Sequence, residues 1–405
     1  MYLKNILYLC RKKASPQQFR ASSIAFGLHF LCSIFAILTD YRGFHMDGFK
    51  NIDIKNFRGI EHLNIDDFAR VNVFLGQNNS GKSSVLEALM LLMGMSNPDM
   101  PQQLNYLRTN AFNPFRNISY LFHNMDINNA PVIMSEQFDA VRRQLELKLS
   151  YIFDGGQSSV ELSGQTATSE TKTFLNTLEM NFSIESGEVK QHYKSSITIN
   201  QTTGMIANRT MAEGYLEKNS ASFLPAALTS AGLVENLAEL IKRKKKSVIL
   251  ERMRIFDSHI NAIEVINNDV FIGFEGVGEL MPVGMTGDGL RRYLNIVAST
   301  GNTVNNIILI DEIDNGLHYS AYKKLWESIF VLASETNKQV FITTHSKETL
   351  MKLHEMLEEH SEYQEMFRLY TIEKTLLKGH KAYKYGYEGL ANACMNDVEL
   401  RSIAL

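Results

Sequence analysis

The chain has 405 residues, of which 44% are hydrophobic and 21% are charged, as in ordinary soluble globular proteins. This length suggests one large domain or two. A net charge of −3 gives no sign of a globally basic nucleic-acid-binding protein, and three widely separated cysteines indicate neither a zinc site nor a disulfide framework.

The first 45 residues have a different pattern from the rest. Basic residues precede an apolar run over residues 24–39, which is the pattern of a signal peptide or a short membrane anchor. The run is shorter than the roughly 20 residues that a spanning helix needs, and His29 lies inside it. Met46 stands just before the first strand-like segment. We therefore expect residues 1–45 to be an extension without a folded role, and residues 46–405 to form the domain.

Three short segments after Met46 are strand-like. Residues 49–57 alternate between apolar and polar, residues 60–65 follow a turn, and residues 71–75 are mostly apolar. We expect these segments to form one compact β unit that leads into the next motif. Residues 95–135 are rich in Asn and Pro, which predicts loops with Leu121 and Phe122 as buried anchors.

The strongest motif of the chain lies between residues 71 and 94. Its loop matches G-x-x-x-x-G-K-[ST] and stands between a strand-like run and a helical pattern, which is the context that a P-loop requires. Glycines let the backbone fold closely around phosphate, and the helix N-terminus favours an anion there. We expect Lys82 to reach the β- and γ-phosphates of ATP and Ser83 to bind Mg²⁺. The predicted nucleotide-binding residues of this loop are Gly76, Gln77, Asn78, Asn79, Ser80, Gly81, Lys82, Ser83 and Ser84.

The middle of the chain predicts a second lobe, inserted at about residues 95–280. Residues 144–153, 178–184 and 194–199 alternate as an antiparallel sheet does, with a Gly/Ser/Thr-rich loop at 155–171. Residues 231–255 predict one helix, and residues 262–274 predict a hairpin. The basic run at 242–246 is either a solvated helix face or a phosphate-contacting patch.

The C-terminal part contains a buried strand that ends in two carboxylates. Residues 307–310 are all apolar, and Asp311 and Glu312 follow at the strand end where open α/β sheets place their ligands. We expect Asp311 to bind Mg²⁺ and Glu312 to act as general base on the attacking water. A second buried strand, residues 339–343, leads to His345, which we interpret as a γ-phosphate sensor. Residues 319–332 predict a helix, and two strand-like runs and a short helix follow after residue 367.

These motifs together resemble those of the ABC-type ATPases of the SMC, RecF and OLD group, and more narrowly the standalone bacterial AAA-family ATP-binding proteins within it. The matching stretches are FKNIDIKNFRGI, GQNNSGKSS, MTGDGLRRYL, ILIDEIDNGLH and FITTHSKE, which occur in order over about residues 46–401. The resemblance identifies Lys82 and Ser83 as Walker A residues, Asp311 and Glu312 as the Walker B pair, and His345 as the switch histidine.

The same resemblance implies two further sites. Asp314 falls in the D-loop, and the ABC signature segment comprises Thr286, Gly287, Asp288 and Gly289, which depart from the transporter sequence LSGGQ. Relatives also use a glutamine between their lobes, for which Gln137 and Gln144 are the candidates. The nuclease domain of OLD proteins is not expected, because the sequence holds no D-x-D pair and about sixty residues follow His345.

The sequence therefore predicts an α/β P-loop NTPase of the ABC-ATPase head type, with a mostly parallel core sheet flanked by helices and an antiparallel β lobe. We expect ATP and Mg²⁺ as cofactors, hydrolysis of ATP, and an ATP-dependent homodimer in the cytoplasm rather than at a membrane. One hypothesis links this switch to nucleic acid, in DNA transactions or phage defence, by family analogy alone. The alternative is an ATP-gated assembly platform for a separate effector protein.

Overall fold

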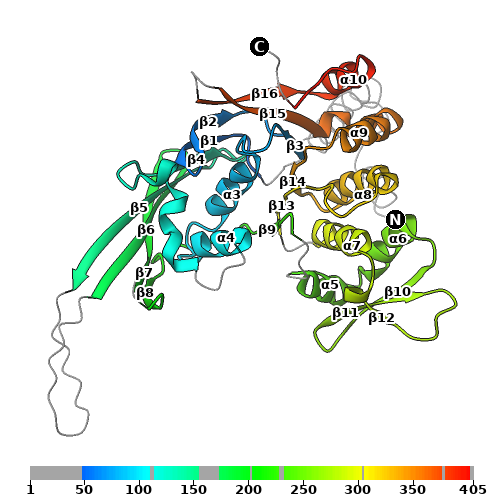
Figure 1. Ribbon diagram of the computed structural model, residues 1–405, viewed down its shortest axis with the longest axis horizontal. Helices are drawn as coiled ribbons and strands as arrows, with labels where there is room; N and C mark the ends of the chain where they lie inside the picture. Colours follow the sequence, from blue (N-terminus) through cyan, green and yellow to red (C-terminus); the bar gives the residue numbers. More distant parts are fainter. Residues whose placement is uncertain are drawn as a thin grey trace, which may run out of the picture. The chain divides into compact units, whose positions relative to one another are not determined.

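A computed structural model of the chain describes residues 48–109, 114–154, 173–200, 203–227, 232–302, 305–375 and 379–401. Residues 46–405 form one compact unit (Figure 1). The predicted N-terminal extension and the predicted loop at 155–171 lie outside the described residues. Within the described part of the chain, every helix is too short or too polar to cross a membrane.

A six-stranded sheet forms the centre of the nucleotide-binding half. Its strand order is β16-β15-β3-β14-β13-β9, and all strands are parallel except β16 at one edge. Buried residues on both faces of β3, β13 and β14 explain why these strands lie inside the sheet. The strands are β3 (Val71–Leu75), β9 (Ala221–Leu224), β13 (Ile307–Ile310), β14 (Gln339–Thr343), β15 (Phe367–Thr375) and β16 (Gly379–Tyr385).

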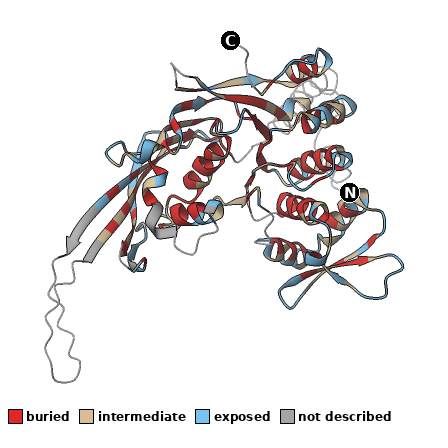
Figure 2. Ribbon diagram, viewed as in Figure 1, coloured by how far each residue is buried: buried red, intermediate tan, exposed pale blue. Residues whose placement is uncertain are grey.

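Helices cover one face of this sheet. Alternate residues of the core strands point into that layer, as Ile308, Ile310, Val340 and Ile342 do, and pack against the helices in one hydrophobic core. Figure 2 shows that α7 and α8, in the middle of this layer, are largely buried. The helices are α5 (Leu233–Lys242), α6 (Lys246–Phe256), α7 (Asp288–Gly301), α8 (Tyr322–Glu335), α9 (Lys347–Glu359) and α10 (Tyr387–Met395).

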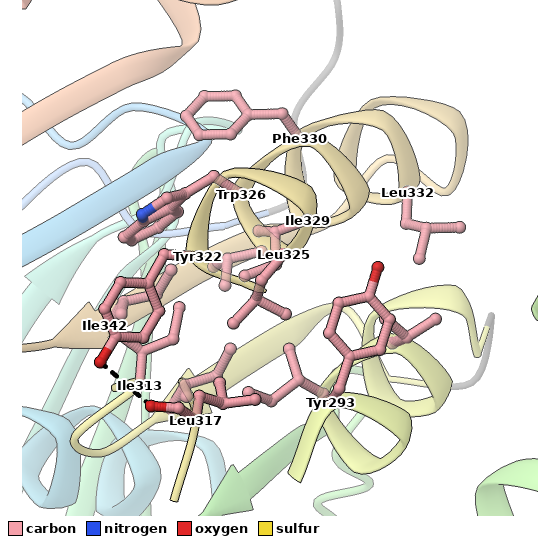
Figure 3. Close-up of a cluster of buried hydrophobic side chains, with 14 of the residues drawn as sticks. Tyr293, Ile313, Leu317, Tyr322, Leu325, Trp326, Ile329, Phe330, Leu332 and Ile342 are labelled. Atoms are coloured by element: carbon pink, nitrogen blue, oxygen red, sulfur yellow. Dashed lines mark hydrogen bonds between the residues drawn. The ribbon is translucent and has the colours of Figure 1, made fainter. Parts of the chain in front are cut away.

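Helix α8 packs against α7 and α9 through large aromatic side chains of this core, with Tyr293 on the α7 side of α8 and Trp326 on its other side (Figure 3). Trp326 is fully buried, and its indole N–H donates to the Thr349 carbonyl at 3.0 Å. The Tyr293 hydroxyl lies 2.8 Å from the Ser328 hydroxyl, so the polar end of each ring has a partner. These hydrogen bonds connect α8 to both α7 and α9 and fix the positions of the three helices relative to one another.

The opposite face of the core sheet packs against α3 (Lys82–Met93) and a seven-stranded antiparallel sheet. Phe74, Leu309 and Phe341 belong to this second hydrophobic core. The sheet order is β2-β1-β4-β5-β6-β7-β8, and α3 lies between the two sheets in Figure 1. Its strands are β1 (Ile52–Phe57), β2 (Ile60–Ile65), β4 (Val132–Glu136), β5 (Arg142–Asp154), β6 (Thr173–Ser186), β7 (Val189–Asn200) and β8 (Ile206–Thr210).

The predicted architecture of a mostly parallel core sheet with an antiparallel sheet is confirmed, but two details of its assembly were wrong. β3 does not join β1 and β2; it pairs with β14 and β15, because it is buried on both faces whereas β1 and β2 alternate. The lobe is also not a single insertion over residues 95–280. β1 and β2 belong to the antiparallel sheet, while β9 pairs with β13 in the core sheet.

Helical details differ from the sequence-based expectation in two places. Residues 100–109 form helix α4 (Met100–Thr109) within the stretch predicted as loops, followed by short 3-10 turns at Pro114–Leu121 and His123–Met125. The helix predicted over 231–255 is two helices, α5 and α6. It breaks because Lys244 adopts positive φ and the Lys245 N–H bonds back to the Leu240 carbonyl, the geometry of a Schellman C-cap.

The predicted hairpin forms β10 (Ile260–Ile266) and β11 (Asp269–Phe274), with Asn267 and Asn268 at positive φ in the turn. A short strand, β12 (Met281–Pro282), completes a separate three-stranded sheet. One turn of 3-10 helix, Val283–Met285, then connects β12 to the residues before α7. The hairpin thus leads directly into the predicted signature segment.

Candidate functional site

The P-loop connects the end of β3 to the start of α3. Gly76 and Gly81 both have positive φ, and Gly81 is the N-cap residue of α3. A Cβ at position 76 would lie 2.3 Å from the Ile372 carbonyl oxygen and 2.5 Å from the Ser80 hydroxyl oxygen, so a side chain has no room there. The loop therefore needs glycine at this position for both its backbone conformation and its close packing.

Lys82 extends along the inside of this loop. Its Nζ donates to the Gly76 carbonyl at 2.8 Å and to the Gln77 carbonyl at 2.9 Å. Burial lowers the pKa of the Lys82 ammonium, while the charges of Asp311 and Glu312 oppose this change. A triphosphate beside this ammonium would favour its charged form further.

Ser83, Asp311 and Thr343 form a hydrogen-bonded group at the ends of α3, β13 and β14. The Ser83 hydroxyl donates to Asp311 Oδ1 at 2.8 Å, and the Thr343 hydroxyl donates to the same oxygen at 2.6 Å. Ser83 and Asp311 are 228 residues apart in sequence, yet the structure brings them into contact. The sequence analysis assigned no role to Thr343, although it lies in the FITTHSKE stretch, because only the fold shows that its hydroxyl reaches Asp311.

Glu312 lines the same cavity as Lys82 and Ser83. Its backbone φ is 48°, a conformation that costs a non-glycine residue free energy and often marks a functional position. The Thr343 hydroxyl oxygen accepts the Glu312 N–H at 2.8 Å, and the Ile313 N–H donates to the Thr343 carbonyl at 3.0 Å. Neighbouring strand β14 therefore holds the turn that presents this carboxylate.

A buried arginine on α7 also holds the turn at Asp311 and Glu312. Arg292 on α7 is 2% exposed and donates to the carbonyls of Pro225 and Asp311, both at 2.6 Å, and of Glu312 at 3.1 Å. Burial lowers the pKa of its guanidinium, and Asp311 opposes that change. The sequence indicated only that Arg292 follows the signature segment. Its side chain points towards the Walker B turn because of the way α7 packs in the fold.

Asp314 and His345 lie together beside the Walker B turn. The Thr344 hydroxyl donates to the Asp314 carboxylate, and His345 Nε2 is 4.0 Å from Asp314 Oδ2. The His345 side chain is 50% exposed and is not among the residues that line the P-loop cavity. The imidazole is therefore accessible to solvent beside the Walker B turn.

The predicted signature segment stands at the N-terminus of α7. Gly287 is the N-cap residue of that helix, and a Cβ built on it meets no atom within 4 Å. A Cβ on Gly289 would lie 3.1 Å from the Gly316 carbonyl, so the segment packs beside the D-loop. None of the four residues Thr286, Gly287, Asp288 and Gly289 lines the P-loop cavity.

The P-loop cavity has a volume of about 570 Å³ and includes charged residues that the sequence did not reveal. Arg58 and Arg108 line it, and both form ion pairs at 2.5 Å with the buried carboxylate of Glu87 on α3. Neither glutamine candidate, Gln137 or Gln144, is among the lining residues. The only sequence signal for Arg58 was its place beside Gly59 in the predicted turn between two strands, and that signal did not indicate a position at the cavity.

The basic run at 242–246 spans the break between α5 and α6. Glu239 pairs with Lys242 at 3.7 Å and with Arg243 at 2.7 Å, and Glu264 pairs with Lys246 at 2.7 Å. The run therefore presents less net positive charge to solvent than its sequence suggests.

Comparison with known proteins agrees with these features. The profile of the AAA ATPase domain family matches residues 49–350. A Helicobacter pylori protein called ATP/GTP phosphatase is 26% identical over 333 residues, which cover 76% of this chain and 88% of that protein. The DNA replication and repair protein RecF of Lactococcus lactis is 49% identical over 43 residues, 11% of this chain and 12% of RecF.

Among solved structures, the Smc head domain of Pyrococcus furiosus, bound to the C-terminal domain of ScpA, covers 87% of this chain and 100% of its own, with 11% identity and a TM-score of 0.42. The head domain of SMC from Thermotoga maritima covers 84% of this chain and 98% of its own, with 12% identity and a TM-score of 0.36.

Proposed function

Because the chain belongs to the AAA ATPase domain family, we propose that its P-loop cavity hydrolyses ATP with Mg²⁺ and that ATP binding switches the chain from monomer to homodimer. The observation that supports this most strongly is the contact between the Ser83 hydroxyl and Asp311, with Glu312 in the same cavity. The Helicobacter pylori relative is named an ATP/GTP phosphatase, which supports a purine nucleoside triphosphate as substrate.

The residues at this site fit a magnesium ion. Ser83 and Asp311 offer a hydroxyl and a carboxylate oxygen 2.8 Å apart, and hard oxygen ligands with bound phosphate and water are what Mg²⁺ prefers. When bound, the ion neutralises developing phosphate charge. The Thr343 hydroxyl, which donates to the same carboxylate, would orient it for this task.

Hydrolysis then depends on positioning by this chain's own side chains. Lys82 donates from inside the loop towards the β- and γ-phosphates, and the helix N-terminus of α3 adds partial positive charge. Glu312 orients the attacking water and accepts its proton. Thr343 and Arg292 hold the backbone of Glu312 from two sides, so the carboxylate is kept in place before substrate arrives.

The dimer follows from the position of the signature segment. Gly287 and the N-terminus of α7 are open, as a surface that caps the γ-phosphate of a second subunit must be. Two identical chains can exchange this contact symmetrically, each covering the other's nucleotide. In that arrangement His345 and Asp314 would meet the partner side of the site.

Three variants test this proposal by light scattering with ATP, ADP and no nucleotide. Glu312→Gln should bind ATP and Mg²⁺ and accumulate as a dimer, because the base is lost and hydrolysis no longer opens it. Adding Gly287→Arg should block the dimer while each subunit still binds ATP. Gly386→Arg is the matched control and should leave the dimer intact, because Gly386 is the N-cap of α10 and a Cβ built on it likewise meets no atom within 4 Å. An oligomeric state that ignores nucleotide, or a dimer that tolerates Gly287→Arg, contradicts the switch.

The biological use of this switch is the second part of the proposal. Pairing of Lys242, Arg243 and Lys246 with two glutamates favours the assembly platform for an effector protein over direct nucleic-acid contact through this run. The measurement that separates them is salt-dependent DNA binding. A titration in which DNA binding weakens steeply with salt and upon neutralisation of Lys244 and Lys245 would favour the nucleic-acid hypothesis instead.

A further inference from the structure

The P-loop cavity has a second wall that the mechanism above does not use. Besides the P-loop, Glu312 and two arginines, it is lined by Tyr120, Phe122, Asn124 and Met125. Lys82, Ser83 and Glu312 mark the end that takes the triphosphate. These four residues therefore belong to a part of the cavity that remains for the rest of the nucleotide.

This wall is firmly attached to the turn between β1 and β2. The Arg58 N–H donates to the Leu121 carbonyl at 2.9 Å, and His123 Nδ1 lies 2.9 Å from the Arg58 carbonyl. Phe57 and Phe122 form a β-bridge, and both rings are buried. These hydrogen bonds and the β-bridge fix the wall to the antiparallel sheet, so its position beside the cavity is set by the fold.

The backbone of the wall is strained where it meets the cavity. Asn124 has φ 53° and Met125 has φ 60°, so two consecutive non-glycine residues adopt the left-handed conformation. Asn tolerates this region, whereas Met does so at a cost of roughly 1–2 kcal/mol. The turn leaves both side chains exposed beside the cavity, with Met125 58% exposed. Strain that persists at the edge of a ligand cavity is characteristic of a binding function.

We propose that this wall is the base site of the nucleotide and that the Asn124 amide reads the edge of a purine. The inference rests on the proposed function, since the triphosphate must occupy the P-loop end for the base to reach residues 120–125. Met125 and the exposed ring of Tyr120 supply the polarisable and aromatic surfaces on which a base packs.

The chemistry of an amide explains why this site accepts both purines. Asn124 offers one acceptor oxygen and one donor NH₂ group. Adenine presents an amino donor beside the N1 acceptor, and guanine presents the O6 acceptor beside the N1–H donor. Rotation of the amide by half a turn matches one pattern or the other, so the site takes ATP and GTP. A pyrimidine is smaller and would lose packing against Met125.

Replacing this amide with a carboxylate should separate the two purines. In Asn124→Asp the side chain only accepts, so it takes both N1–H and N2–H of guanine but leaves adenine N1 without a donor. We expect ATP to bind roughly tenfold more weakly, while GTP binds as well as before or better. Calorimetry with each nucleotide measures the shift. Asn268→Asp is the matched control, because Asn268 has φ 62° and does not line the cavity.

A ligand without a base separates this inference from the proposed function. Inorganic tripolyphosphate should bind Asn124→Asp and the unaltered protein equally, and Lys82→Ala should abolish its binding. If tripolyphosphate binding depends on Lys82 but the ATP-to-GTP preference is the same in Asn124→Asp, Asn268→Asp and the unaltered protein, the base site is refuted while the P-loop function stands. If tripolyphosphate binding ignores Lys82, both are refuted.

Discussion

Arg292 allows the support of the Walker B turn to be tested quantitatively. Arg292→Met keeps most of the side-chain volume but removes three donors, so the carbonyls of Pro225, Asp311 and Glu312 lose their partner. At about 1 kcal/mol net for each hydrogen bond, the loss is about 3 kcal/mol. For a unit of this size that corresponds to a fall in Tm on the order of 4 °C.

The activity of the same variant should fall by more than its stability suggests. Glu312 stands at positive φ, and one of the groups that holds its backbone is Arg292. With that support gone, the carboxylate no longer stays where it can orient water, and we expect ATP turnover to drop at least tenfold at a temperature where the protein remains folded. Affinity for ATP should change little, because Lys82 and the P-loop are untouched.

The neighbouring residue provides the control for stability. Arg291 is half-exposed and pairs with Asp288 on the surface of the same helix, so Arg291→Met should cost less than about 1 kcal/mol. Thermal unfolding followed by circular dichroism compares the two variants directly. If Arg292→Met has the same Tm as Arg291→Met and retains full ATP turnover, the buried arginine does not support the Walker B turn and the reasoning is wrong.

Four further predictions concern other parts of the chain. Lys82→Ala should abolish ATP binding in calorimetry, because the ammonium inside the P-loop is lost; unchanged affinity would refute the P-loop assignment. Burial lowers the pKa of the Lys338 ammonium from its ordinary value of 10.5 to about 7, so the unfolded chain binds more protons between these values and stability should rise with pH there. Lys338→Met should flatten that rise in urea unfolding between pH 7 and 9, and parallel profiles would contradict the assignment. A chain that starts at Met46 should fold and keep full ATPase activity; aggregation would show that the extension belongs to the fold. Neutralising Lys244 and Lys245 should leave ATP turnover unchanged, and a loss of turnover would tie the run to the active site.

The local geometry of the P-loop and of the strand before Asp311 was predictable because short segments encode it. The P-loop is specified by two glycines and a lysine at fixed spacing, and the structure shows why: a Cβ at position 76 has no room, and Lys82 fills the loop. The strand before Asp311 and Glu312 was recognisable from four apolar residues in a row, which are buried on both faces of the sheet. Such patterns reflect backbone and solvent preferences that act over a few residues.

The sequence by itself could not show what depends on contacts between distant residues. The partners of β3, the Thr343 hydroxyl on Asp311 and the inward direction of Arg292 all result from sheet order and helix register, which join residues that lie tens to hundreds of positions apart. The wall at residues 120–125 was expected to be a loop with two anchors, and only its attachment to the β1–β2 turn places Asn124 at the cavity. Sequence periodicity determines the face that an element buries, but packing of all elements together decides which residues meet there.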